Sequence, residues 1–175
     1  MRQFANWIIP TAPAGTSDKR AASTEFVTGA ISTAVGFSQG TWTPTLTFST
    51  PGDINVVYST RNGQYLRLGS LVIVNWSILT STFTFSTASG NVAVSGLPFT
   101  TDANFTPITR GPVAHGVGFF FTAGYTGLLV TPDASAITMT FRLFGNSTTI
   151  INAGTSNFTS GTNVDLRATV PYVAA

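Results

Sequence analysis

From Gly40 to the end of the chain, apolar and polar residues alternate with a period of two, and glycine or Asx residues interrupt the pattern at short intervals. The stretch TWTPTLTF (41–48) sets four threonines against Trp42, Pro44, Leu46 and Phe48. Such alternation is typical of half-buried strands, and many short strands separated by turn residues are typical of antiparallel sandwiches and barrels. We therefore predict an all-β fold for residues 37–175, an antiparallel β-sandwich with a jelly-roll-like arrangement.

Two local features refine this prediction. Pro44 restricts its strand to a sheet edge or a bulge, because proline has no amide hydrogen to donate. Asn62 and Gly63 lie between the strand-like stretches 54–60 and 64–69, and Asn-Gly readily takes the positive φ of a tight hairpin turn. Among the aromatic residues we expect a core role for Trp42, Tyr58, Tyr65 and Trp76.

The first 36 residues follow different patterns. Residues 1–15 show no periodicity, and two prolines favour an extended path, so we predict an arm. Residues 16–36 are predicted as a neck segment with a helix from about residue 17 to residue 35, because apolar residues there recur every three or four positions. Within the arm, four apolar residues are candidate anchors for another protein: Phe4, Trp7, Ile8 and Ile9.

The small number of charged residues bears on association. Only 8% of the residues are charged, whereas about a quarter is usual. Neutral surface is easily buried against copies of itself, so we expect an obligate homo-oligomer. The net charge of +2 provides no basic stripe for nucleic acid. No apolar stretch reaches the roughly 18 residues of a membrane span, so we also expect no membrane insertion.

The predicted helix is a further candidate surface for association between copies of the chain. We predict that Phe26, Val27, Ala30 and Ile31 lie on one face and form a seam with two symmetry-related copies. An ordinary amphipathic helix lying on the protein's own sheet fits the same periodicity. The arm likewise has an alternative reading as a terminus folded back over its own β domain.

Several segments resemble the tail fibres and tailspikes of bacteriophages. The N-terminal segment PAGTSDKRAASTEFV (13–27) resembles a recurring loop and helix of these proteins. The stretches GTWTPTLTF (40–48), VVYSTRNGQYLRLGSLVIVNWSI (56–78) and VSGLPF (94–99) resemble a distal β domain of the same proteins, in the same order. The resemblance covers roughly half the chain and ends near residue 100.

The resemblance implies a homotrimeric virion protein that is made in the host cytoplasm and adsorbs to a bacterial surface glycan. Residues 1–15 would bind a tail or baseplate protein, residues 16–36 would form the neck, and residues 37–175 would form the head. The expected function is that of a short tail fibre or receptor-binding tip. A capsid decoration or head-fibre protein is the alternative, and a polysaccharide-degrading tailspike is the third reading.

We expect no enzyme activity and no catalytic residues. Glycoside hydrolysis usually uses two carboxylates, and the predicted head has four: Asp53, Asp102, Asp133 and Asp165. We interpret Asp53, Asp102 and Asp133 as turn residues whose side chains bond nearby backbone amides. We also expect no metal and no cofactor, because the chain has no cysteine and one histidine, His115. Three copies of His115 around a trimer axis would be the exception.

Sugar binding uses flat rings edged by amide and hydroxyl groups. The stretches FFFTAGYTG (119–127) and NFTSGTN (157–163) offer this mixture. Alternation places either Phe119 and Phe121 or else Phe120 in the core, and leaves Tyr125 and Asn157 as the candidate ligand-binding residues at the surface.

Overall fold

The computed structural model describes residues 24–104, 110–146 and 148–175, and the chain divides into two compact units, Met1–Phe37 and Ser38–Ala175. In the first unit, α1 spans Thr24–Val35. It confirms a helix in the predicted neck, whereas the predicted start of that helix before residue 24 lies outside the described residues. The predicted arm, with Phe4, Trp7, Ile8 and Ile9, also lies outside them.

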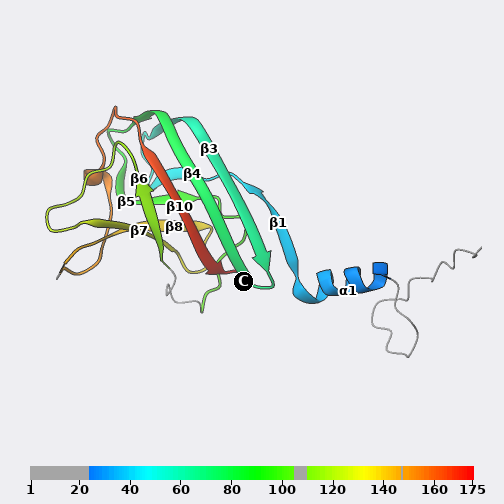
Figure 1. Cartoon of the computed structure of the whole chain (residues 1–175). Coiled ribbons are helices and arrows are strands. Elements are labelled where there is room, and N and C mark those ends of the chain that lie inside the picture. Colours follow the sequence, from blue (N-terminus) through cyan, green and yellow to red (C-terminus); the bar gives the residue numbers. More distant parts are fainter. Residues whose placement is uncertain (1–23, 105–109, 147) are drawn as a thin grey trace, which may run out of the picture. The chain divides into compact units, whose positions relative to one another are not determined.

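The second unit is built almost wholly from β-strands (Figure 1). A short 3₁₀ helix, η1, spans Thr155–Asn157. The strands are β1 (Phe37–Trp42), β2 (Thr45–Thr50), β3 (Asn55–Leu68), β4 (Leu71–Thr84), β5 (Ser89–Ser95), β6 (Gly111–His115), β7 (Gly127–Pro132), β8 (Thr138–Phe144), β9 (Ile151–Asn152) and β10 (Asp165–Val173).

The strands form one curled antiparallel sheet, a half-barrel. The hydrogen-bonded order is β1-β3-β4-β10-β6-β7-β8-β5-β2, and β9 pairs with β8 beside this path. Strand β6 pairs with β10 on one side and with β7 on the other, so it joins what would be the two separate sheets of a sandwich. The prediction of an antiparallel all-β fold is therefore confirmed, but the strands form one continuous sheet in place of two stacked ones.

The short link between β1 and β2 shows that the sheet is strongly curled. Strands β1 and β2 lie at opposite ends of the strand order, yet only Thr43 and Pro44 separate them in sequence. The chain can cross between the two edges in so few residues only where curling brings those edges together. The predicted strand 41–48 is thus two strands, each at an edge of the sheet, and Pro44 lies in the link between them rather than within a strand.

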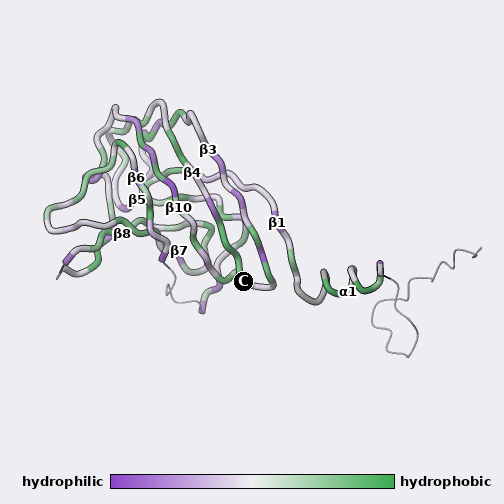
Figure 2. The backbone as a smooth tube through the Cα atoms, in the orientation of Figure 1, coloured by the Kyte–Doolittle hydropathy of each residue, from purple (hydrophilic) through white to green (hydrophobic). Residues whose placement is uncertain are grey.

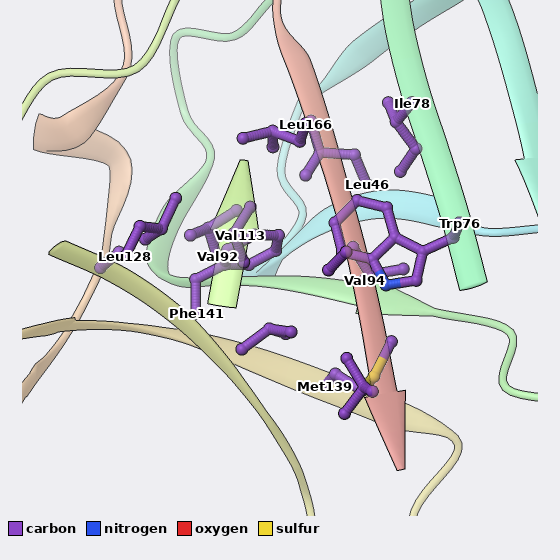
Figure 3. Close-up of a cluster of buried hydrophobic side chains, with 14 of the residues drawn as sticks. Leu46, Trp76, Ile78, Val92, Val94, Val113, Leu128, Met139, Phe141 and Leu166 are labelled. Atoms are coloured by element: carbon purple, nitrogen blue, oxygen red, sulfur yellow. The ribbon is translucent and has the colours of Figure 1, made fainter. Parts of the chain in front are cut away.

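The core fills the inside of this curl. Figure 3 shows side chains from β2, β4, β5, β6, β7, β8 and β10 that point toward one another, with the indole of Trp76 among them. Trp76 is 1% exposed, and its ring lies edge-on to Phe141 at 6.0 Å between centroids. The predicted core aromatics are confirmed, because Trp42 is buried and Tyr58 and Tyr65 pack against the buried cluster.

The prediction of a hairpin turn at Asn62 and Gly63 is wrong. Both residues lie inside β3, where Asn62 pairs with Ser77 and Gly63 pairs with Trp76. Gly63 is buried, and a Cβ built on it would lie 2.6 Å from Nε1 of Trp42. The glycine therefore does not form a turn. It leaves room for the indole ring to pack against the strand, and close packing is a common reason for a glycine within a strand.

The turn lies instead at the end of β3. Leu68 and Leu71 pair directly, so Gly69 and Ser70 form a two-residue loop. Gly69 has a φ of +59°, which suits glycine at the first central position of such a hairpin. The 14-residue strands β3 and β4 consequently form the longest pair of the sheet, with register shifts beside Tyr58.

Candidate functional site

The loop that joins β6 to β7 carries the aromatic residues expected to contact a ligand. Phe119 is 7% exposed and packs edge-on against Phe158, with 5.3 Å between ring centroids. Phe121 is partly buried and lies edge-on to Phe119 and to the ring of His115. Phe120, between them in sequence, is 53% exposed. Of the two alternatives, Phe119 and Phe121 are therefore the core residues, and Phe120 is the surface ring.

Asn157 forms hydrogen bonds with both the amide and the carbonyl group of Phe120. The main-chain oxygen of Asn157 accepts a hydrogen bond from the Phe120 amide at 2.9 Å. Its Nδ2 donates to the Phe120 carbonyl oxygen at 2.9 Å and to Thr122 Oγ1 at 3.1 Å, while its Oδ1 accepts from the Gly154 amide at 2.9 Å. These bonds hold an exposed aromatic ring on a supported loop.

This placement changes how the two predicted ligand residues are read. Asn157 is 3% exposed rather than at the surface, and both of its amide hydrogens are used within the chain. Tyr125 is partly buried, and its hydroxyl donates to the carbonyl oxygen of Thr149 at 3.0 Å. Their contact with a ligand stays a prediction, and the structure gives both a supporting role. Alternation along residues 119–121 was the signal that could have identified Phe120.

The aromatic cluster behind the loop ties it to the rest of the sheet. Phe48 of β2 and Phe83 of β4 both contact Phe158, with ring centroids 6.1 Å and 5.5 Å away. Tilted and edge-on pairs of this kind contribute about 0.5–1.5 kcal/mol each beyond the area that they bury. The loop end therefore rests on rigid strands.

The four head carboxylates are all engaged within the fold. Asp102 accepts from the nearby Asn104 amide, as expected of a turn residue. Asp133 instead accepts from the hydroxyl groups of Thr138 and Thr140, and Asp165 forms an ion pair with Arg167 at 3.1 Å. These interactions give each carboxylate a structural partner.

Asp53 links two loops that are far apart in sequence. Its Oδ1 accepts from the amides of Ser86, Thr87 and Ala88 at 2.8, 2.7 and 3.3 Å. The Ser86 bond, followed by the Thr87 bond, lowers the pKa of Asp53 to about 2. The expectation of local turn bonds was wrong for this residue, because its partners lie on the loop between β4 and β5.

The outer face of the sheet carries two adjoining hollows of about 620 Å³ and 610 Å³. Both hollows are lined by Asn75 of β4 and Thr169 of β10. The first also has Gln39, Gln64 and Ile73 in its lining, so amide groups and an aliphatic side chain meet there. The second hollow is lined in addition by Arg167 and Ser77.

The predicted seam residues of α1 differ in exposure. Val27 is 42% exposed and Ile31 is 58% exposed, Ala30 is exposed, and Phe26 is partly buried. Figure 2 shows the hydrophobic residues along this helix. Their role in trimerisation stays a prediction.

Within residues 24–104, 110–146 and 148–175, no cluster of three or more His, Asp or Glu side chains could hold a metal ion. In the same part of the chain, no helix has the length and apolar character needed to cross a membrane.

No protein-family model and no curated protein matches the chain. The fold does match a solved structure, that of the Dettilon tailspike protein, with a TM-score of 0.53 and 15% identity over 77% of this chain. The chain has the fold of part of a tailspike protein. The tailspike resemblance seen in the sequence is thus confirmed at the level of fold, and it extends past residue 100, where no motif was recognised. The matched region is 23% of the Dettilon tailspike chain.

Proposed function

We propose that this protein is a structural component of a phage tail, a short homotrimeric fibre or receptor-binding tip that adsorbs to a glycan on the bacterial surface. The observation that carries the proposal is the tailspike fold over 77% of the chain. The order of the tail-fibre motifs in residues 13–99 supports it independently. Residues 1–15 would join the protein to a tail or baseplate protein.

The exposed ring of Phe120 is the best candidate for contact with sugar. A flat apolar ring surrounded by neutral hydrogen-bonding groups suits the weakly polar face of a sugar ring. The neighbouring exposed residues are neutral as well: Thr122, Ala123, Thr159 and Ser160. Several weak sites on one particle would combine into firm attachment without any chemical step.

Adhesion is favoured over cleavage by the way in which the carboxylates are used. A hydrolase needs one carboxyl group free to give a proton and another free to act on the sugar or on water. The side-chain oxygens of Asp53, Asp133 and Asp165 accept hydrogen bonds that hold the fold together. Release of reducing sugar from bacterial envelope polysaccharide by the purified protein would overturn this choice.

The test of adsorption uses an array of bacterial surface polysaccharides. The purified full chain should bind a subset of them, and Phe120→Ala should lower that binding at least about tenfold, as expected when a stacked ring is lost. Phe37→Ala is the matched control, because Phe37 is 50% exposed and lies on β1. Equal binding by both variants and the parent would remove Phe120 from the proposed site.

Location on the virion is tested separately. Gold-labelled antibody against the chain should mark the tail of intact particles. Labelling confined to the capsid would favour the decoration or head-fibre alternative.

A further inference from the structure

An aliphatic patch covers one end of the outer face of β3, β4 and β10, which run side by side (Figure 1). In the strand register, Leu66 pairs with Ile73, which pairs with Pro171 on its other side; in the next row of this face, Leu68 pairs with Leu71, which pairs with Val173. These six residues form two adjacent cross-strand rows, and we call them the aliphatic patch.

The patch is exposed although its side chains are of the kind that fills a core. Leu66, Leu68, Leu71 and Ile73 are 40%, 44%, 42% and 37% exposed. Scattered apolar residues on a surface are ordinary, whereas a contiguous apolar area rimmed by polar groups marks a protein contact. Burial of four such side chains would favour association through the hydrophobic effect.

The rim of the patch is neutral and self-complementary. In the row beyond Leu66 and Ile73, Gln64 pairs with Asn75 and Asn75 pairs with Thr169. An amide group both donates and accepts a hydrogen bond, so a rim of amides can bond to a copy of itself. A rim of like charges would instead repel its own copy.

Three charged residues lie near the patch. The Asp102 amide donates to the carbonyl oxygen of Val173 at 2.9 Å, and the Oδ1 of Asp102 accepts from the Asn104 amide. Arg67 lies between two patch residues in sequence, yet its guanidinium stacks 4.4 Å from the ring centre of Phe99, and its Nε donates to the Gly69 carbonyl oxygen. Arg167 is one row beyond the amides, opposite Ser77, and forms an ion pair with Asp165. Contact between this patch and a copy of it would therefore leave both arginines with their partners, and it would place Asp102 at the edge of the contact.

We propose that the aliphatic patch is the surface through which the β units of neighbouring copies of this chain contact one another. The inference rests on the homotrimer of the proposed function and assigns its main contact to the sheet rather than to α1 alone. Six aliphatic residues and the amide rim supply the apolar centre and polar edge of an ordinary subunit interface.

Thiol labelling tests the inference with little disturbance, because the chain has no cysteine. Ile73→Cys places a thiol in the patch, and Ile137→Cys places one at a position that is 48% exposed and outside it. In the assembled protein, a thiol-reactive maleimide should label Ile73→Cys at least about tenfold more slowly than Ile137→Cys, since burial protects a thiol. Equal rates in an oligomeric sample would overturn the proposal.

Sedimentation of charged variants provides the second measurement. Ile73→Lys should shift the full chain from trimer toward monomer at micromolar concentration, whereas Ile137→Lys should leave the trimer unchanged. A trimer that survives Ile73→Lys would overturn the proposed patch contact but leave the homotrimer standing. A parent protein that is monomeric would overturn both the patch contact and the trimer, while its binding to the polysaccharide array would still test adsorption.

Discussion

Over residues 71–74, the two faces of β4 carry similar aliphatic side chains but differ in burial. On the inner face, Val72, Val74, Trp76 and Ile78 are each at most 1% exposed. On the outer face of the same strand, Leu71 and Ile73 are 42% and 37% exposed. The inner residues are covered by strands from the rest of the curled sheet, and the outer ones face away from it. The comparison teaches that the aliphatic character of a strand face does not reveal whether the same chain covers that face.

The largest effect that would sharpen this comparison is expected at Trp76. Trp76→Ala should lower the free energy of unfolding by about 3–5 kcal/mol, because the cavity lies where the strands converge. Trp76→Phe is the control and should cost less than about 1.5 kcal/mol, since it keeps an aromatic ring and removes an Nε1–H group that has no hydrogen-bond partner among the described residues. Denaturant titration measures both values. A loss below about 1 kcal/mol for the alanine variant would mean that the inner face tolerates a cavity.

A smaller loss is expected at Gly63, on the inner face of β3. Gly63→Ala should cost about 1–3 kcal/mol, because its Cβ would meet the Trp42 indole at 2.6 Å. Asn62→Ala should change stability by less than about 0.5 kcal/mol, since Asn62 is exposed within the strand. If both substitutions cost the same in thermal or denaturant unfolding, the packing role of Gly63 is wrong.

The buried Tyr172 should make the stability of the fold depend on pH in the alkaline range. Burial raises its pKa to about 12 from 10.0, against the opposing effects of its hydrogen bond to the Phe99 oxygen and of Arg67. Because the folded state favours the neutral phenol, this stabilisation is complete below pH 10.0 and is lost as the pH rises through about 12. Tyr172→Phe should cost about 1 kcal/mol at neutral pH and should reduce the alkaline loss. An identical pH profile for the variant would exclude Tyr172 as the titrating group.

The smallest effect is expected on the outer face. Ile73→Thr should change the free energy of unfolding of the dissociated subunit by less than about 0.5 kcal/mol, because the residue is partly in water already. Val74→Thr on the adjacent inner position should cost about 1–3 kcal/mol, since it buries a hydroxyl group among apolar side chains. Dilute samples followed by tryptophan fluorescence would measure both. Equal losses would remove the distinction between the faces.

Sequence patterns predicted the β class, the antiparallel pairing and the aromatic core, because alternation and bulky apolar residues act locally. They also predicted the helix in the neck, whereas Pro44, expected within a strand, lies between two strands. The role of Asn157 was beyond them, since its hydrogen-bond partners Phe120 and Thr122 lie more than 30 residues away. The same is true of Asp53, whose partners follow another strand.

By itself, then, the sequence determined which residues share a face within a strand, but not where each strand begins and ends. It did not determine that β3 runs through Asn62 and Gly63, because Asn-Gly permits a turn but does not require one. Only the tertiary structure decided that an indole occupies the space beside Gly63, and that β1 and β2 become the two edges of one curled sheet. The physical reason is that a period of two fixes the direction of a side chain, whereas its burial depends on strands that are distant in sequence.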